Sequence, residues 1–461
     1  MTRGLKLIKL ALVSGTATLA LALSPAALAA TTFPFTYVNP DGSKVIIPSK
    51  PTRVVDISQA EGDLDLLASI GVHPIAAQGY GGGTDVNADA FPDWENGGEL
   101  NGIQVVGNDN GPPDYEKIAS LNPDLILVDP YYGAAEISQL EAIAPTVQEY
   151  FPATEFTRQF GWQAEMLKLA PIFDATARAD SVVARLMQRE DVLKPFVKGT
   201  SVASMQPFAG TPADYAIDPG NGGDATMYYL ADANVESKVK GLPTSGPNSG
   251  YGSEETLPNV TASKLIVEFY GNQGISDTTE KAFKASPLYH KIPAEKKGQV
   301  YFTDWFVYGP IGNADMIQQL QKEMYGVTGL EATLKGTGSH KSSSGVADID
   351  VGPTDKRVCW DVTTTGAIGS PNAAVIEDAK GATLFALGNG YHTTGCTNVT
   401  KSAGKQLLAS SKYLVAIEKN TTVLLHGTIG MASPAFFGNG KDTYYKAGSA
   451  GSTGMGLGPT G

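Results

Sequence analysis

Between residues 31 and 330, short apolar runs alternate with stretches in which apolar positions recur at helical spacing. The apolar runs, bounded by turn residues, predict strands at 53–57, 74–77, 103–106, 124–128, 202–205, 264–269 and 299–302. The stretches with helical spacing predict helices at 64–70, 115–121, 137–143 and 316–324. Because strands and helices alternate, the pattern predicts an α/β fold with parallel sheets and helical crossovers.

A longer helical pattern interrupts this alternation at residues 162–197, where Pro171 is expected to kink the helix or to begin a new one. We therefore expect two α/β lobes, 30–158 and 199–330, joined by a connecting helix at 159–198. In each lobe a Glu at a helix start leads through a turn to a buried strand, so the lobes resemble one another. Two similar lobes predict a ligand cleft between them.

The first 29 residues have the pattern of a signal peptide. Arg3, Lys6 and Lys9 precede an apolar run at 10–23, and small residues at Ala27 and Ala29 form a cleavage pattern. A membrane anchor is the weaker alternative, because the run is shorter than the roughly 20 residues needed to span a bilayer. No Cys follows this region closely, so we expect a secreted, periplasmic or cell-surface protein that is not a lipoprotein.

Residues beyond 330 differ in composition. A linker is expected at 331–356, a small β-rich domain at 357–437 and a Gly/Ser-rich tail at 438–461. Cys359 and Cys396 are the only cysteines and predict one disulfide, worth about 4 kcal/mol for a loop of this size. A zinc site would need more ligands than this pair.

Charge and motifs exclude several functions. The chain carries a net charge of −13, which argues against nucleic acid or an anionic membrane as partner. Residues 31–330 hold 38 acidic against 20 basic side chains, so the acidity belongs to the two lobes. No nucleophile elbow, HExxH or P-loop occurs, and the GxGxxG match at 456–461 has no strand or helix around it. We therefore expect neither an enzyme nor a resident metal or cofactor.

Several segments, in order along the chain, resemble the substrate-binding proteins of ABC importers for ferric siderophores, haem and cobalamin. They are Pro51-Thr-Arg-Val-Val, Leu66-Leu-Ala-Ser-Ile-Gly-Val-His-Pro-Ile, Tyr115-Glu-Lys-Ile-Ala-Ser-Leu-Asn-Pro-Asp-Leu-Ile, Ile143-Ala-Pro-Thr-Val and Lys297-Gly-Gln-Val-Tyr. The resemblance covers about residues 51–322. It implies two lobes joined by a rigid helix, capture of a ligand outside the membrane, and delivery to a permease.

The resemblance also implies docking residues. Glu116 and Glu254 fall where the family places one surface carboxylate on each lobe to meet Arg residues of the permease, and Glu255 is a substitute for Glu254. The alternative is that a Glu in a first helical turn only complements the helix dipole.

Ligand contacts are expected on loops that follow strand ends. Most of the candidates are aromatic and would line a pocket for a bulky, partly apolar ligand. They are Tyr80, Tyr131, Tyr132, Arg158, Phe208, Tyr251, Tyr270, Trp305 and Tyr308. Each could instead be partial core.

The distribution of arginine residues narrows the chemical class of the expected ligand. Residues 199–330 contain no Arg, and the first lobe offers only Arg53 and Arg158. A ferric tris-catecholate is strongly anionic and needs several guanidinium groups, whereas a ferric hydroxamate is neutral or cationic. Haem would need an axial Tyr or His. The binding proteins of zinc or manganese importers use clusters of His and carboxylates, and two histidines, His73 and His290, are too few for such a site.

We therefore expect a monomeric receptor for a ferric siderophore, favouring a hydroxamate, with iron present only in the bound complex. A haem- or cobalamin-binding protein, or a secreted surface or matrix interaction protein that retains the fold, are the alternatives.

The C-terminal domain resembles, faintly, the secreted chordin-type (CHRD) domain. The matching segments are Val358-Cys-Trp, Leu387-Gly-Asn-Gly-Tyr, Gly395-Cys and His426-Gly-Thr-Ile. The usual His-x-His segment is replaced by Ala374-Val-Ile-Glu377, which places a metal role in doubt.

Overall fold

A computed structural model describes most of the chain between residues 30 and 432. The described residues are 30–57, 61–79, 102–108, 111–128, 132–149, 161–208, 211–217, 233–236, 239–242, 251–268, 276–303, 309–366, 368–369, 371, 373–388, 392–409, 412–432 and 458–459. The predicted leader at 1–29 and nearly all of the tail at 438–461 lie outside these ranges. Within them, no helix is both long and apolar enough to cross a bilayer.

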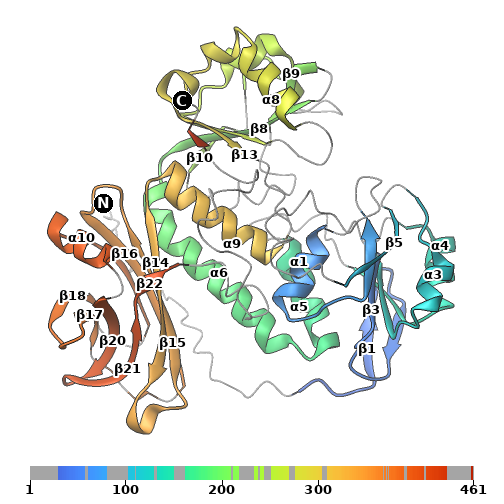
Figure 1. Cartoon of the computed structure of the whole chain (residues 1–461), viewed down its shortest axis with the longest axis horizontal. Coiled ribbons are helices and arrows are strands. Elements are labelled where there is room, and N and C mark those ends of the chain that lie inside the picture. The colour runs from blue at the N-terminus through green and yellow to red at the C-terminus, as the bar shows by residue number, and fades with distance from the viewer. Residues whose placement is uncertain are drawn as a thin grey trace, which may run out of the picture.

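The N-terminal lobe is a parallel five-stranded sheet with helices and an added β-hairpin (Figure 1). Its elements are β1 (Phe35–Val38), β2 (Lys44–Ile47), β3 (Val54–Ile57), α1 (Glu61–Ser69), β4 (Ala76–Gly79), β5 (Gln104–Asn108), α3 (Tyr115–Ser120), β6 (Leu125–Val128), α4 (Ala134–Glu141) and β7 (Thr146–Gln148). The strand order is β5-β4-β3-β6-β7. β3 and β6 are buried along their whole length, which explains why they read as apolar runs without alternation.

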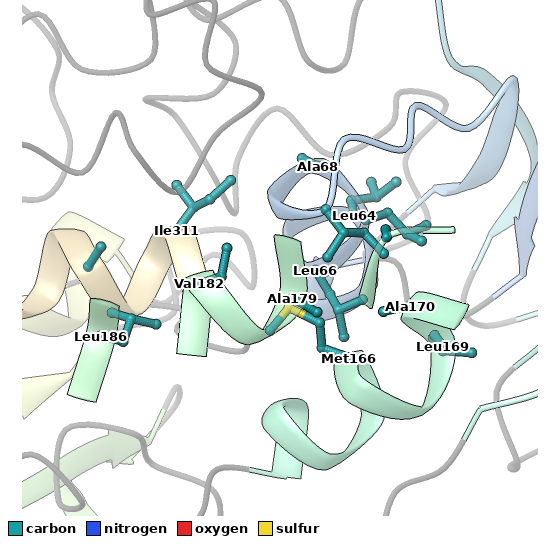
Figure 2. Close-up of a cluster of buried hydrophobic side chains, with 14 of the residues drawn as sticks. Leu64, Leu66, Ala68, Met166, Leu169, Ala170, Ala179, Val182, Leu186 and Ile311 are labelled. Atoms are coloured by element: carbon teal, nitrogen blue, oxygen red, sulfur yellow. The ribbon is translucent and has the colours of Figure 1, made fainter. Parts of the chain in front are cut away.

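The connecting segment consists of α5 (Gly161–Leu169), the 3₁₀ helix η1 (Ala170–Phe173) and the 22-residue α6 (Thr176–Val197). Pro171 lies in η1, so the expected break in the helix is present. The first half of α6 packs with α1, α5 and α9 (Pro310–Gln319) in one apolar cluster. In this cluster Ala179 lies close to Met166 and Leu66, and Val182 lies beside Ile311 of α9 (Figure 2).

The C-terminal lobe is a mixed sheet flanked by short helices. Its elements are β8 (Ser201–Phe208), β9 (Thr211–Ile217), β10 (Asn234–Val235), β11 (Tyr251–Gly252), η2 (Glu254–Asn259), β12 (Lys264–Glu268), α8 (Ser276–Ala285), η4 (Tyr289–Lys291), η5 (Glu295–Lys297), β13 (Val300–Thr303), α9 and the π-helix η6 (Leu320–Met324). β8, β12 and β13 are parallel neighbours. β9 pairs antiparallel with β8, and β11 pairs antiparallel with β9 at the end of the sheet. A two-residue strand, β23 (Gly458–Pro459), pairs with β13.

In both lobes, side-chain hydrogen bonds link the amino ends of neighbouring central strands. Before β6, Asp124 accepts hydrogen bonds from the backbone N–H groups of Thr52 and Arg53, each at 2.8 Å. Before β12, the backbone N–H of Ser263 donates to Ser201 Oγ, and Ser263 Oγ donates to the carbonyl of Ser201, both at 2.8 Å. The similarity of the lobes therefore extends to how their strands are tied together.

The C-terminal module comprises residues 328–432. Its elements are β14 (Thr328–Gly336), η7 (Gly338–His340), β15 (Ser344–Val351), β16 (Arg357–Thr365), β17 (Ala373–Asp378), β18 (Thr383–Gly388), β19 (His392–Asn398), α10 (Lys401–Leu408), β20 (Tyr413–Lys419), β21 (Thr422–Thr428) and β22 (Gly430–Met431). The strand order is β18-β17-β20-β21-β14-β15-β16-β19. Thr393 Oγ1 of β19 donates to the Leu387 carbonyl of β18 at 3.1 Å, so the sheet curves until its two ends meet around an apolar core.

The expected linker at 331–356 is wrong. These residues supply β15 and most of β14, which pair with each other over eight residues in the middle of the module's sheet. The polar residues Asp348 and Asp350 and the nearby Gly and Ser residues gave this segment a loop-like composition. In the structure one face of β15 packs on the module core and the other packs on α6, which is why its carboxylates are buried.

The predicted disulfide is present. Cys359 of β16 and Cys396 of β19 are directly paired in the antiparallel ladder, with their Cα atoms 4.0 Å apart. Two cysteines directly opposite each other on neighbouring strands lie close enough for their Sγ atoms to bridge. The bond therefore joins the last strand of the sheet to the strand next to it.

Candidate functional site

The candidate ligand site lies at the carboxyl ends of the parallel strands. In the N-terminal lobe the chain proceeds from β3 to β4 and β5 on one side, and then crosses to β6 and β7 on the other. Ile57 and Val128, the last residues of β3 and β6, are neighbours at this change of direction. Such a switch point is where open α/β sheets bind ligands. The segments 58–60 and 129–131 that follow these strands lie outside the described residues.

Of the predicted ligand contacts, only Tyr132 has a described side chain. It is half-buried and packs against the apolar cluster on the α3 and α4 side of the sheet. Phe208 and Tyr251 are placed by their backbone, at the end of β8 and in β11, two strands that both pair with β9. The other six predicted contacts lie outside the described residues: Tyr80, Tyr131, Arg158, Tyr270, Trp305 and Tyr308.

Buried carboxyl groups near this edge were not anticipated from the sequence. Asp56 of β3 and Glu149, which directly follows β7, are fully buried, and Glu165 of α5 is 1% exposed. Burial and the charges of Glu165 and Glu149 raise the pKa of Tyr37, which places these carboxyl groups near its ring. One signal was available, since Asp56 is a charged residue inside an apolar run that must be buried on both faces.

Arg53 is not available to a ligand in this structure. Its Nε donates to the carbonyl of Asn122 at 3.0 Å, and its Nη2 donates to the carbonyl of Leu121. The guanidinium therefore binds the C-terminal end of α3, at the amino ends of the strands. Of the two arginines in the first lobe, only Arg158 remains a candidate for ligand contact.

A pocket of about 330 Å³ lies at the opposite end of the N-terminal sheet. Its lining includes Val54 at the start of β3, Gly71 after α1, and Arg178 of α6. This pocket is distant from the carboxyl ends of the strands, so it is separate from the candidate site.

The three candidate docking carboxylates have different surroundings. Glu116 is exposed in the first turn of α3, whose N-terminus is capped by Asp114 through a bond from the Lys117 N–H at 3.0 Å. Glu254 is half-buried in η2, and its Oε1 accepts a hydrogen bond from Ser286 Oγ. Glu255 is exposed, and the bond that it accepts from Ser253 Oγ at 2.6 Å lowers its pKa. Glu254 is thus built into its lobe, whereas Glu116 and Glu255 face solvent.

The described residues contain no group of three or more His, Cys, Asp or Glu side chains placed to hold a metal ion. His73 is exposed, and His290 lies at the surface with its Nδ1 3.0 Å from Glu295.

Comparison with known proteins agrees with this geometry. Residues 80–305 match the family model described as periplasmic binding protein. This part of the chain, slightly less than half of the whole, is similar to the proteins of that family. The binding-protein region therefore has the two-lobed α/β architecture that its sequence predicts, followed by a β-rich module.

Two curated relatives come from Bacillus subtilis (strain 168). "Iron(3+)-hydroxamate-binding protein FhuD" is 28% identical over 283 residues, which are 60% of this chain and 80% of the relative. "Probable siderophore-binding lipoprotein YfiY" is 26% identical over 280 residues, 59% of this chain and 80% of the relative. Among solved structures, the periplasmic catecholate-siderophore binding protein VctP of Vibrio cholerae has a TM-score of 0.48 and 20% identity, with coverage of 61% of this chain and 97% of VctP.

Proposed function

We propose that this protein is the extracytoplasmic receptor of an ABC importer, and that it captures a ferric siderophore of the hydroxamate type and delivers it to a permease. The leader at 1–29 would be removed on export, and the mature protein would carry no lipid anchor. It would bind the chelate as a monomer and catalyse no covalent step.

The observation that carries the choice of ligand is the distribution of charge around the candidate site. The C-terminal lobe, residues 199–330, contains no Arg, and Arg53 binds backbone carbonyl groups. Asp56 and Glu149 are buried beside the carboxyl ends of β3 and β7. An anionic tris-catecholate would bind close to these buried carboxyl groups with few guanidinium partners, while a neutral or cationic hydroxamate complex would not be repelled.

One of the two curated relatives supports the same class of ligand, and the other is named only for siderophore binding. The first is named for binding iron(3+)-hydroxamate, and it aligns with 60% of this chain. The aromatic residues expected after the strand ends would supply apolar contacts for the organic part of the chelate.

Fluorescence titration of the mature chain, residues 30–461, tests this proposal. Ferrioxamine, a ferric tris-catecholate, haem and cobalamin would each be added while the Trp and Tyr emission is recorded, with the iron-free hydroxamate as the chemical control. We expect ferrioxamine to quench the emission at micromolar concentration and the catecholate to quench it far less. Absence of quenching by all four ligands would overturn the receptor function.

Two Trp variants separate the site from the rest of the protein. Trp305 is an expected ligand contact, whereas Trp360 lies in β16 of the module. Trp305→Phe should remove most of the quenching by ferrioxamine, and Trp360→Phe should leave it unchanged.

The module favours a second candidate, a surface or matrix interaction protein in which the binding-protein fold is retained but transport is lost. It adds a complete β-sheet domain to the two lobes. The same titration distinguishes the two functions, because this candidate predicts no quenching by any of the four ligands.

A further inference from the structure

A stripe of polar side chains on the second half of α6 is buried against the module. Arg185 and Arg189 both donate to Glu331 Oε2 of β14, at 2.8 and 2.6 Å, and Arg185 also donates to Asp348 Oδ2 of β15. The side chains of both arginines are less than a tenth exposed, as is that of Asp348. The module therefore covers charged groups of α6 and neutralises them.

Neighbouring contacts extend this interface to β16. Gln188 Nε2 donates to the carbonyl of Asp361 at 2.9 Å. The guanidinium of Arg357 lies over the ring of Phe196, 5.4 Å from its centre. At Gly352 the backbone approaches the same ring so closely that a Cβ would lie 2.8 Å from Phe196 Cε1. The module is thus fitted to α6 from Arg185 to the end of the helix.

A second attachment joins the module to the last helical turn of the C-terminal lobe. Gln321 of η6 donates from Nε2 to both carboxyl oxygens of Asp350, at 2.8 and 2.9 Å, and both residues are buried. A Cβ at Gly329 would lie 2.7 Å from Gln321 Oε1, so β14 passes close to this amide.

The turn between η6 and β14 is in turn fixed to the base of the C-terminal lobe. Tyr325 Oη lies 3.1 Å from Thr200 Oγ1, just before β8. Lys264 Nζ, at the start of β12, donates to the Met324 carbonyl at 2.9 Å and lies over the Tyr325 ring. Burial raises the pKa of Tyr325 to about 12.

Detaching the module would be costly. Separation would return the four paired charged side chains of α6, β14 and β15 to water only if β14 also moved, and β14 follows η6 after only three residues, 325–327. Partial detachment would leave buried charges without their counter-ions, which is the most destabilising state of an ion pair. A flexible appendage would have neither buried ion pairs with the rest of the protein nor a strand tied so closely to the preceding helix.

We infer that the module is a third structural lobe, held rigidly to the C-terminal lobe by α6 and η6, and that the two unfold as one cooperative unit. Figure 1 shows the module on one side of α6 and the C-terminal lobe at the end of that helix, while the N-terminal lobe lies at the other end. When the lobes move relative to one another, the module moves with the C-terminal lobe.

Pulse-labelling hydrogen exchange in urea tests this inference on the mature full chain. In the wild type, peptides of β15 and β16 should lose protection at the same urea concentration as peptides of β8 and β12. Arg185→Met should lower both midpoints together, by about 1 M urea or more. Lys194→Met is the matched control on the same helix; its partners Glu190 and Asp191 pair with it near the surface, and neither midpoint should move.

Separate midpoints for the module and the C-terminal lobe in the wild type would overturn the inference, even if Arg185→Met fails to fold. A fall in the midpoint of the module alone in Arg185→Met would also overturn it.

A distance measurement extends the test and rests on the proposed function. Spin labels would be placed at cysteines replacing the exposed residues Ser138, Lys296 and Lys405, one in each lobe and one in the module. A diamagnetic gallium hydroxamate should change the 138–405 distance and leave the 296–405 distance constant. A change at 296–405 would overturn the rigid attachment, and a constant 296–405 distance would support it whether or not the 138–405 distance changes.

Discussion

Asp65 of α1 accepts a hydrogen bond at 2.7 Å from the backbone N–H of Ile311, in the first turn of α9. Asp65 is fully buried, and α9 follows the last parallel strand of the C-terminal lobe. The carboxylate therefore caps a helix from the other lobe and provides a second connection between the lobes besides α6.

Replacing this cap should destabilise the protein. Asp65→Ala leaves the buried Ile311 N–H without its acceptor, and we expect a loss of about 1–3 kcal/mol in the free energy of unfolding. Asp65→Asn keeps an acceptor oxygen and should lose less. Urea unfolding followed by circular dichroism measures both, with Asp180→Ala on the exposed side of α6 as the control. Equal stability of Asp65→Ala and the control would show that the cap is unimportant.

Asp350 should make stability depend on pH. Burial raises its pKa well above the usual value and the charge of Asp348 adds to this, while Gln321 and the charge of Arg189 oppose it. A raised folded-state pKa stabilises the protein at low pH, and that contribution is lost as pH rises through the folded pKa.

Asp350→Asn, which does not titrate, should therefore gain stability relative to the wild type as pH increases. Melting temperatures of both proteins across pH 4 to 9 provide the measurement. A constant difference between the two across that range would refute the assigned titration. Asp378→Asn serves as the control because Asp378 is only half-buried and accepts hydrogen bonds from the backbone N–H groups of Lys380 and Ala382, which lower its pKa.

Reduction of the disulfide should weaken the module. The bond closes a loop with a sequence separation of 37, for which the chain-entropy model gives about 4 kcal/mol. Cys359→Ala with Cys396→Ala, and the wild type in a reducing agent, should both show this loss in chemical denaturation. Because the double variant cannot be reduced, the reducing agent should not affect it further; a similar response of both proteins would assign the effect to another cause.

Three carboxylates should respond differently to truncation. Glu116→Ala and Glu255→Ala remove exposed groups, so both should keep fold stability and ferrioxamine binding while lowering uptake in cells that express the cognate permease. Glu254→Ala removes the acceptor of Ser286 Oγ and should cost about 1 kcal/mol of stability. Loss of ferrioxamine binding in Glu116→Ala or Glu255→Ala would contradict a docking role, and undiminished uptake in the double variant would do so as well.

The central parallel strands of the two lobes could be predicted because burial on both faces leaves a simple apolar signature. The segments 124–128 and 264–269 predicted β6 and β12 to within a residue. Pro171 correctly indicated the break between α5 and α6.

The prediction of a linker was wrong because tertiary packing buries polar residues that would normally indicate an exposed segment. Asp348 and Asp350 alternate with apolar residues in β15, a pattern that normally places the polar face in water. Here that face meets Arg185 and Gln321, which are far away in the sequence. Nothing local in residues 331–356 indicates such partners, so the segment resembles a linker until the position of α6 is known.

The side-chain fastenings at Asp124 and at Ser201 with Ser263 lie at the amino ends of the strands, opposite the edge expected to meet the ligand. Recognition and structural support are thereby assigned to different ends of the same sheets. Under the proposed function, substitutions in the segments after the strand ends would alter which chelate is accepted without disturbing the bonds that hold the strands in register. Such a division would allow a receptor to acquire a new ligand through changes at one end of its sheets while the hydrogen bonds at the other end stay unchanged.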